Sequence, residues 1–288
     1  MAITLGGGGS SSQINEVVSL NNNANIVTLA DGRVYLKGGV IETNTSTYPL
    51  AQTSYQPAGI NFSVAAQEIN PSGIAWDGTY FWVLGRTGQD LNKYNAAGVY
   101  QNVSFLVNQV GADVKDVVWD GTVFRILAAQ YIITYNSSGT YSGYYDLTAQ
   151  TTAGQGIAWD GTYYYVVENS GSYNVYKYNS SGVYQSVAFS VAEQATLPSG
   201  ITWDGTSFWV TDYGTDSVYK YNSSGVYQSV VFSVSSQDSI PMGIVSKGGG
   251  DTSLFMVGQQ NDKVWEYKPA NGVSSTATLG GQNYVRVV

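Results

Sequence analysis

The sequence predicts an all-β protein: a five-bladed β-propeller of four-stranded antiparallel blades, with a small N-terminal β module. Within each unit the apolar runs are short, rich in β-branched and aromatic residues, and bounded by turn residues, as strands are. No stretch keeps a 3.6-residue apolar period, which argues against helical repeats. A repeated unit of four strands with this spacing, ~40–45 residues, is typical of a propeller blade. Units built around Gly-Ile-x-Trp-Asp-Gly start 40 to 44 residues apart, at Gly73, Asp116, Gly156, Gly200 and, in degenerate form, Gly243.

The unit that begins at Gly200 shows the expected strand order most clearly. Asp204-Gly205 predicts a type I′ hairpin turn, which needs φ > 0 at both central positions. Asn222-Ser223-Ser224-Gly225 predicts the turn before the last strand. We expect the Trp of each Trp-Asp-Gly to fill space between neighbouring blades, so that the motif is structural rather than part of a site. The four predicted strands are residues 201–203, 208–210, 218–221 and 226–234.

A second marker indicates how the ring closes. An aromatic residue stands eleven positions before every unit start, at Phe62, Phe105, Tyr145, Phe189 and Phe232. The first aromatic, Phe62, thus comes before the first unit start, and the last unit start has no outer-strand aromatic after it. We expect residues 57–68 to supply the closing outer strand of the last blade, which leaves no open sheet edge at the join.

These markers divide the chain into four predicted segments. They are a flexible N-terminal tract (1–12), a small β attachment module (13–50), the propeller (51–272) and a C-terminal strand segment (273–288). Asp31-Gly32 predicts a hairpin within the attachment module. About forty residues are too few to hold a large core alone, so this module is expected to pack against a partner, against copies of itself or against the propeller.

A different assignment of the same region is open. Leu29-Ala30-Asp31-Gly32 resembles a degenerate unit start, which would make residues 26–50 a sixth blade. Ala30 stands where the Trp should be, and a polar run follows Glu42. Both features favour five blades.

Composition excludes several classes of function. The 288 residues contain no His, the commonest general base and metal ligand, and no Cys, so disulfides and thiolate chemistry are absent. A net charge of −8 with only 12 Lys and Arg argues against binding of a phosphate backbone. No apolar run approaches the ~20 residues of a membrane span. We expect no cofactor, no metal ion, no nucleic-acid partner and no membrane insertion.

Loops after the second strand of each unit are the candidate ligand-binding region. They offer amides, carboxylates and an aromatic ring, groups that suit neutral polyhydroxyl ligands, and a propeller would hold them on one face. The candidate ligand-binding residues are Arg86, Asp90, Glu168, Asp212, Tyr213, Asp216 and Asp262.

Catalysis by these carboxylates is the alternative hypothesis. A glycosidase needs two carboxyl groups about 5–9.5 Å apart, a separation that sequence does not give. Because fold alone carries no chemistry, we assign no catalytic residue. Calcium could bind the same groups, but no spaced ligand loop is evident, so no metal ligand is assigned.

The repeats resemble NHL-type β-propeller repeats. The opening of that repeat is carried best by Pro71-Ser72-Gly73-Ile74, Pro198-Ser199-Gly200-Ile201 and Pro241-Met242-Gly243-Ile244. The second and third units lack the Pro, and the second has Asp116 in place of Gly. The resemblance covers about three-quarters of the chain and implies a fold rather than a function.

The N-terminal segment resembles a different group of proteins. Residues 26–37 and the following Thr47-Tyr48-Pro49 are similar to the N-terminal part of tailed-bacteriophage tail-fibre and related virion proteins, and 284–287 to their ends. The resemblance implies that residues 13–50 bind other virion proteins and that the distal domain contacts the host.

Together these features predict a non-enzymatic phage virion protein, a tail fibre or receptor-binding component that contacts a host-surface glycan or protein through its propeller. A purely structural, decorating virion protein and a polysaccharide-degrading tail enzyme are the alternatives. The N-terminus has neither a basic region nor an apolar core, so no signal peptide is expected. We therefore expect synthesis in the host cytoplasm and function in the extracellular particle, with a homo-oligomer as one arrangement.

Overall fold

The computed structural model describes residues 55–109, 111 and 113–270, together with the backbone of seven short strands in the terminal segments. The chain forms two compact units. One comprises Thr53–Pro269, and the other combines Met1–Gln52 with Ala270–Val288.

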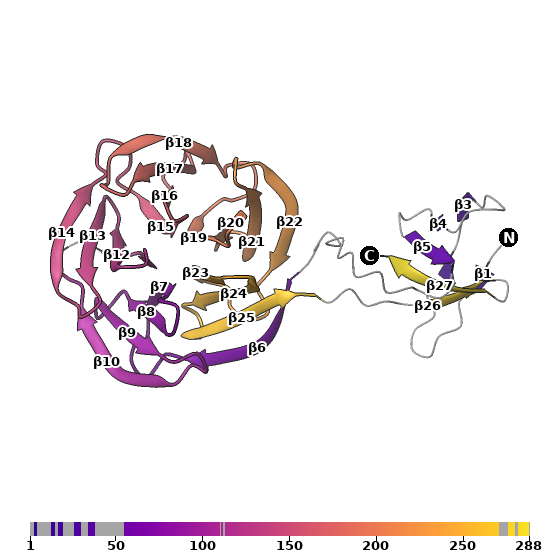
Figure 1. Ribbon diagram of the computed structural model, residues 1–288, viewed down its shortest axis with the longest axis horizontal. Helices are drawn as coiled ribbons and strands as arrows, with labels where there is room; N and C mark the ends of the chain where they lie inside the picture. The colour runs from indigo at the N-terminus through magenta and orange to yellow at the C-terminus, as the bar shows by residue number, and fades with distance from the viewer. Residues whose placement is uncertain are drawn as a thin grey trace. The chain divides into compact units, whose positions relative to one another are not determined.

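The larger unit is a five-bladed β-propeller of four-stranded antiparallel sheets, as predicted (Figure 1). We name the strands of a blade A to D from the ring axis outward. Blade 1 comprises β7 (Pro71–Trp76), β8 (Phe81–Gly85), β9 (Asp90–Tyr94) and β10 (Tyr100–Leu106). Blade 2 comprises β11 (Asp116–Trp119), β12 (Val123–Ala128), β13 (Tyr131–Asn136) and β14 (Tyr141–Asp146). Blade 3 comprises β15 (Gly154–Trp159), β16 (Tyr163–Glu168), β17 (Asn174–Asn179) and β18 (Tyr184–Ser190). Blade 4 comprises β19 (Pro198–Trp203), β20 (Ser207–Asp212), β21 (Ser217–Asn222) and β22 (Tyr227–Ser233).

Blade 5 joins the two ends of the ring. Its strands are β23 (Pro241–Gly248), β24 (Asp251–Gly258), β25 (Lys263–Pro269) and, as outer strand D, β6 (Tyr55–Ser63). Phe62 pairs with Val264 and Asn61 with Trp265. The closing strand is shorter at its end than the predicted 57–68, because residues 64–68 form a turn in which Val64 O accepts the Gln67 and Glu68 amides.

The aromatic marker has a packing reason. Four of the five strand-D aromatics lie beneath the glycine of the C–D turn in the next blade, where any Cβ would overlap the ring. The fifth, Phe232, stacks on Tyr55 of the closing strand, with ring centroids 5.1 Å apart. Among the four, Phe62 lies under Gly98 and Phe189 under Gly225. These glycines also have positive φ, near +80°, which only glycine adopts readily. The marker and the Asn-x-x-Gly turn are thus two halves of one contact between blades.

Glycines also close the hub of the propeller. A Cβ at Gly156 would lie 2.6 Å from the Cα of Gly200, and one at Gly243 would lie 2.6 Å from the Cα of Gly73. The A strands of these blades therefore touch backbone to backbone. In blade 2, Asp116 stands at this position, 1% exposed, and accepts the amides of Val117 at 2.8 Å and Ile157 at 3.0 Å.

The Asp-Gly turns differ from the type I′ prediction. Only the glycine has positive φ, for example Gly205 at +99°, and the loop between the paired residues Trp203 and Phe208 is four residues long. The aspartate carboxylate holds this loop in place. Asp204 Oδ1 accepts the Thr206 and Ser207 amides at 2.8 Å each, and Oδ2 accepts the Trp209 indole N–H at 2.7 Å. The expected I′ turn was wrong because the Asp side chain caps a longer loop.

The hydrophobic core lies between blades. One cluster joins Val167 and Tyr165 of blade 3 to Phe208 and Tyr221 of blade 4. The tyrosine that marks strand C is 1% exposed in every blade: Tyr94, Tyr135, Tyr178, Tyr221 and Tyr267. The Trp of each Trp-Asp-Gly packs against a cluster between blades, as expected, but it lies at the margin of that cluster. Trp203 is only partly buried, whereas Trp209 is fully buried.

The smaller unit contains a five-stranded antiparallel sheet in the order β26-β27-β5-β4-β3 and a separate β1-β2 pair. Its C-terminal strand β27 (Gln282–Val287) pairs with β5 (Val34–Lys37), which in turn pairs with β4 (Ile26–Leu29). These strands are not a sixth blade, because they belong to a sheet outside the ring. The predicted Asp31-Gly32 turn and most of the tract 1–12 lie outside the described residues. The remaining strands of this unit are β1 (Ile3–Thr4), β2 (Gln13–Ile14), β3 (Val17–Ser19) and β26 (Thr276–Leu279).

Candidate functional site

Five residues at corresponding positions of the five blades lie where the B–C loop meets the D–A connection. Each follows strand B directly, and in blades 1, 3, 4 and 5 its amide donates to the residue before strand A of the same blade. Ala129 of blade 2 differs, because its carbonyl oxygen accepts the amide of Gly154 in blade 3 at 3.1 Å. Arg86 N donates to Asn70 O at 3.0 Å, Tyr213 N to Leu197 O at 3.2 Å, and Gln259 N to Ile240 O at 3.0 Å. We call this set the mouth ring: Arg86, Ala129, Asn169, Tyr213 and Gln259.

Arg86 is the cation of the mouth ring. It makes a two-pronged ion pair with Asp113, with Nε–Oδ1 at 2.9 Å and Nη2–Oδ2 at 2.6 Å. Lys115 Nζ approaches the same carboxylate at 2.7 Å. Hydrogen bonding to Asp113 raises the pKa of Arg86, and Tyr213 raises it further electrostatically.

The other members of the mouth ring bring amide groups. Asn169 Oδ1 accepts a hydrogen bond from Gln155 Nε2 at 3.3 Å. Gln259 Nε2 is shielded from solvent and has no hydrogen-bond partner among the described residues. A shielded donor without a partner is costly, so a bound group that accepts its hydrogen bond would be stabilised.

Two of the predicted ligand residues are structural instead. Asp212 is 0% exposed, and its carboxylate accepts the amides of Leu197 at 2.6 Å, Thr196 at 2.9 Å and Gly214 at 3.2 Å. Glu168 is 2% exposed and accepts hydroxyl hydrogen bonds from Thr151, Ser170, Ser172 and Tyr176. Both carboxylates fasten the B–C loop to the preceding D–A connection, so neither is available to a ligand.

In blades 1 and 5 the carboxylate that fastens the B–C loop belongs to the D–A connection instead of strand B. There strand B ends in glycine, and the D–A connection supplies Glu68 or Asp238. Any Cβ at Gly85 or Gly258 would collide with that carboxylate. Asp238 accepts the amides of Ile240, Gln260 and Asn261. In blades 3 and 4 the acid ends strand B, whereas in blades 1 and 5 strand B ends in glycine and the acid stands in the D–A connection. This exchange becomes visible in the sequence only when the units are aligned.

The three remaining predicted residues lie at the start of strand C. Asp216 and Asp262 have left-handed backbones, with φ of 49° and 48°, and their carbonyl oxygens accept the amides of Val234 and Val64 at 2.8 Å. Burial, and then the charge of Asp238, raises the pKa of Asp262. Asp90 lies beside Glu68 between blades 5 and 1. None of these three belongs to the mouth ring.

The sequence signal for the mouth ring is a fixed offset. Arg86, Ala129, Asn169 and Tyr213 each stand thirteen residues after their unit start, and the longer A–B hairpin of blade 5 moves Gln259 to sixteen. Arg86 and Tyr213 were identified by side-chain chemistry alone. Asn169 and Gln259 were missed because an amide is inconspicuous without that offset.

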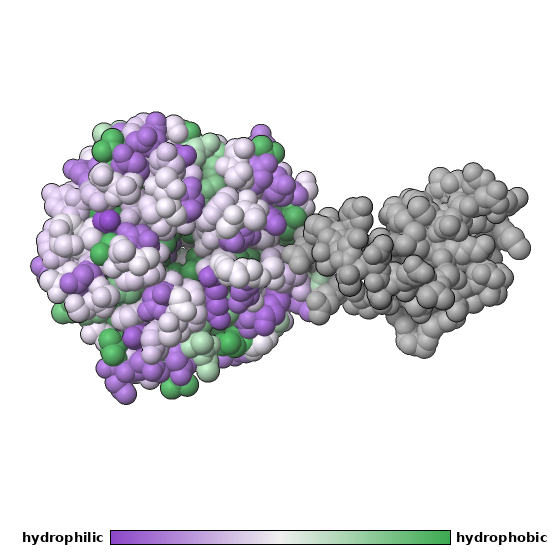
Figure 2. All heavy atoms as spheres, viewed as in Figure 1, coloured by the Kyte–Doolittle hydropathy of each residue, from purple (hydrophilic) through white to green (hydrophobic). Residues whose placement is uncertain are grey.

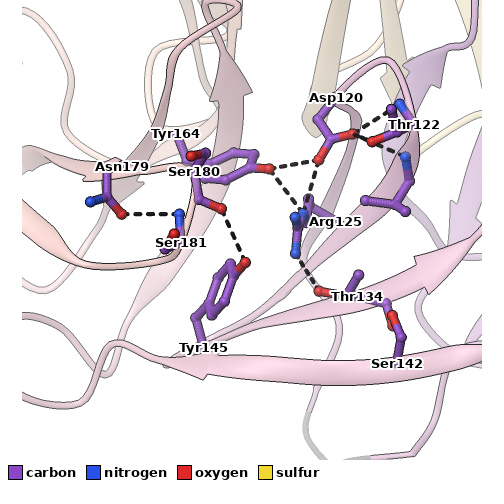
Figure 3. A network of polar contacts seen from close by, with 11 residues as sticks. Asp120, Thr122, Arg125, Thr134, Ser142, Tyr145, Tyr164, Asn179, Ser180 and Ser181 are labelled. Carbon is purple, nitrogen blue, oxygen red and sulfur yellow. Dashed lines mark hydrogen bonds and ion pairs between the residues drawn. The ribbon is translucent and has the colours of Figure 1, made fainter.

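A polar network joins blades 2 and 3 on the A–B side (Figure 3). Arg125 stands where the other blades carry an aromatic residue, Trp82, Tyr165, Trp209 or Phe255. Its Nε lies 3.0 Å from Asp120 Oδ2 and 2.9 Å from Tyr164 Oη, and Tyr164 donates to Asp120 at 2.6 Å. Burial would raise the pKa of Asp120, but these and the turn hydrogen bonds outweigh it, and the pKa is lowered. The groups satisfy one another, so the network is a clamp between blades.

The mouth ring combines a guanidinium, a phenol ring and two carboxamides, which can hydrogen-bond hydroxyl groups and stack on a sugar ring. In the described part of the chain, no three or more Asp or Glu residues gather as a metal cluster. No helix among the described residues is long and apolar enough to cross a bilayer. The face seen in Figure 2 is mostly hydrophilic, with hydrophobic residues in small separate patches.

No protein-family model matches the sequence, and comparison with curated proteins finds no match. Solved structures do resemble it. Glutaminyl cyclase of Myxococcus xanthus is similar with a TM-score of 0.60 and 11% identity, over 74% of this chain and 95% of that one. A chain of a nidogen/laminin complex is similar with a TM-score of 0.51 and 14% identity, over 72% and 75% of the two chains. At such identities the likeness shows one thing, the β-propeller fold.

Proposed function

We propose that this protein is a non-enzymatic binding protein whose propeller holds a neutral, hydroxyl-rich ligand, such as a surface glycan, at the mouth ring. The observation that carries the proposal is the equivalent position of Arg86, Asn169, Tyr213 and Gln259, each held at the end of strand B by a backbone bond to the start of its own blade. These groups can hydrogen-bond hydroxyl groups and stack on a sugar ring, and the Arg86 guanidinium is already paired with Asp113. Such a set suits polyols better than ions.

The biological setting we propose follows from the N-terminal resemblance to tail-fibre and related virion proteins. In that setting the smaller unit docks to other virion proteins, and the propeller contacts a glycan or protein on the host surface. The Glu168 and Asp212 carboxylates already accept hydrogen bonds from the protein, so neither group is free to act as acid or nucleophile. This favours binding over glycoside hydrolysis.

Binding of the whole protein to host cells and to arrayed neutral glycans tests the proposal. Tyr213→Ala removes the stacking ring, and we expect apparent affinity to fall about tenfold, the effect of ~1.4 kcal/mol. Arg86→Ala should weaken binding less, because Asp113 already pairs the guanidinium. Tyr144→Ala is the matched control, since Tyr144 is a 51% exposed tyrosine on outer strand β14. Equal binding by Tyr213→Ala and wild type, or release of shortened glycan products, would reject the proposal.

A further inference from the structure

Blade 1 differs from blades 3 and 4 at one position of strand C. Asn92 pairs with Val83 across the sheet, just as Tyr176 pairs with Val166 and Tyr219 with Val210. Tyr176 Oη donates to the fastening carboxylate of Glu168 at 3.2 Å. Tyr219 Oη lies 3.0 Å from Thr215 Oγ1, which itself donates to the fastening carboxylate of Asp212 at 2.9 Å. A phenol thus fills the space beside the fastening carboxylate in blades 3 and 4, and a short carboxamide replaces it in blade 1.

The space that the smaller side chain leaves in blade 1 is polar and only partly satisfied. Asn92 is 2% exposed, and its Nδ2 has no hydrogen-bond partner. Asp90 stands two residues earlier, where blades 3 and 4 carry Asn174 and Ser217. Asp90 Oδ1 is also shielded from solvent without a partner, while Oδ2 lies 3.4 Å from Ser104 Oγ. Buried polar atoms of this kind usually have a partner, so two together require an explanation.

Asp90 and Asn92 face the same side of the blade, because side chains alternate along a strand. Tyr94 continues that row, and its hydroxyl donates to Gln67 in the turn that leads from β6. The intervening Leu91 belongs instead to the cluster between blades 1 and 2. Asp90 and Asn92 are therefore directed at the seam that Glu68 occupies.

Glu68 and Asp90 bring two carboxylate oxygens to one point. A Cβ at Gly85 would collide with Glu68 Oε2 and lie 2.6 Å from Asp90 Oδ1. A Cβ at Gly88 would lie 3.0 Å from Asp90 Oδ1 and 3.4 Å from Glu68 Oε2. Glycines leave room for both oxygens, whose spacing lets one ion touch both at Ca²⁺–oxygen distances of about 2.4 Å.

No ion pair among the described residues neutralises these two carboxylates. Lys93, the nearest cation along β9, extends over the rings of Tyr80 and Trp82 on the opposite face. Two adjacent carboxylates in a shielded seam repel each other unless a positive charge joins them. Oxygen donors alone select a hard cation over a transition metal.

We propose that the seam between blades 5 and 1 binds one divalent cation of the Ca²⁺ class, held by Glu68 Oε2, Asp90 Oδ1 and the Asn92 carboxamide oxygen. The carboxamide presents that oxygen by rotating about its terminal bond, because its two ends have nearly the same shape. Water and backbone carbonyls complete the six to eight ligands that Ca²⁺ takes. The cation would fasten the closing strand segment to blade 1, the role that buried hydrogen bonds have in blades 3 and 4.

Calorimetric titration of the full chain with CaCl₂, after treatment with a chelator, tests this site. We expect one equivalent of Ca²⁺ to bind and the thermal unfolding midpoint to rise with Ca²⁺ concentration. Asp90→Asn removes the unpartnered carboxylate oxygen and should weaken binding at least tenfold. Asn92→Tyr restores the side chain of blades 3 and 4 and should abolish binding while the protein stays folded.

Asp216→Asn is the matched control, because it makes the same charge change in the B–C loop of blade 4. It should bind Ca²⁺ as tightly as wild type. The proposal fails if wild type shows no binding at millimolar Ca²⁺. It also fails if Asp216→Asn weakens binding as much as Asp90→Asn does, since that pattern marks diffuse attraction by an acidic protein.

Discussion

Asp116 occupies a position at which the other four blades carry glycine. Its carboxyl group replaces a backbone contact at the hub with hydrogen bonds from Val117 and Ile157. Burial raises its pKa well above the ordinary value, opposed by the backbone amides of Ile157, Val117 and Ile74. A single carboxyl group therefore makes the hub sensitive to pH.

The sign of that sensitivity follows from the raised pKa. Between the unfolded and the folded pKa, the folded chain holds a proton that the unfolded chain has released, so the free energy of unfolding falls as pH rises. Asp116→Gly removes this contribution. The stability of the variant relative to wild type should therefore increase from about pH 4 upward, as measured by urea unfolding between pH 3 and 8. A constant difference over that range would show that Asp116 titrates normally.

Side-chain chemistry alone selected two members of the proposed mouth ring. Tyr213 and Arg86 were selected because an aromatic ring and a guanidinium are conspicuous in a polar loop. Asp212 was misassigned, because a carboxylate that fastens a loop and one that awaits a ligand have the same sequence appearance. What separates them is the supply of nearby amide donors, such as Leu197 N, and that depends on how the D–A connection folds over the loop.

Among the elements, the C–D turn connects neighbouring blades through its glycine. Gly225 has φ of +76°, and a Cβ there would overlap the ring of Phe189. Gly205, in the A–B turn of the same blade, has φ of +99° with nothing within 4 Å of a Cβ. Comparing the two glycines distinguishes the cost of backbone strain from the cost of packing. Both turns require a glycine conformation, but only Gly225 lies against an aromatic ring.

Substitution of both glycines by alanine makes the comparison quantitative. Gly205→Ala should cost ~1–2 kcal/mol of unfolding free energy, from the left-handed backbone alone. Gly225→Ala should cost that amount plus a further ~1–3 kcal/mol for overpacking. Urea unfolding of the two variants measures the difference, and Phe189→Leu should reduce the cost of Gly225→Ala. Equal costs for the two glycine variants would mean that the ring moves aside freely.

Element order was predictable, but element boundaries and turn types were less so. Phe62 identified the closing strand, because its offset is set by the contact with a turn in the next blade, and that contact repeats. The strand nevertheless ends at Ser63, since the turn at 64–68 begins where Val64 is bonded to Asp262. The A–B turn type depends on hydrogen bonds that the Asp204 side chain accepts. The dipeptide Asp-Gly alone does not show that these bonds form.

The whole ring depends on one strand from before the first blade. A protein of residues 53–269 contains β6 and should be a folded monomer by size-exclusion chromatography with light scattering. A protein of residues 64–269 leaves β25 as an open edge and should self-associate, because unpaired strand edges template intermolecular pairing. A synthetic peptide of residues 53–63 should restore the monomer by adding the missing strand. Monomeric behaviour of 64–269 without the peptide would show that blade 5 tolerates an open edge.

At this scale the repeat predicted the number of blades, because five unit starts and five aromatics favoured five blades over a sixth at residues 26–50. The return of the C-terminal strand segment to the N-terminal module was a possibility that the sequence left open, and β27 does pair with β5. No repeated motif specifies that pairing, because it joins segments from opposite ends of the sequence.

The closing strand also sets the order in which a newly made chain can finish folding. Ile60 and Glu266, which are hydrogen-bonded in blade 5, lie 206 residues apart. During translation β6 leaves the ribosome before any blade exists, and its partner β25 is among the last propeller strands to appear. Blades 1 to 4 can each form from adjacent strands as they emerge, whereas the ring cannot close until synthesis of the propeller is almost complete. A chain that ends prematurely within the last blade would therefore have four folded blades and an open ring with exposed strand edges. Completion of the chain is thus the step that protects this protein from aggregation and proteolysis.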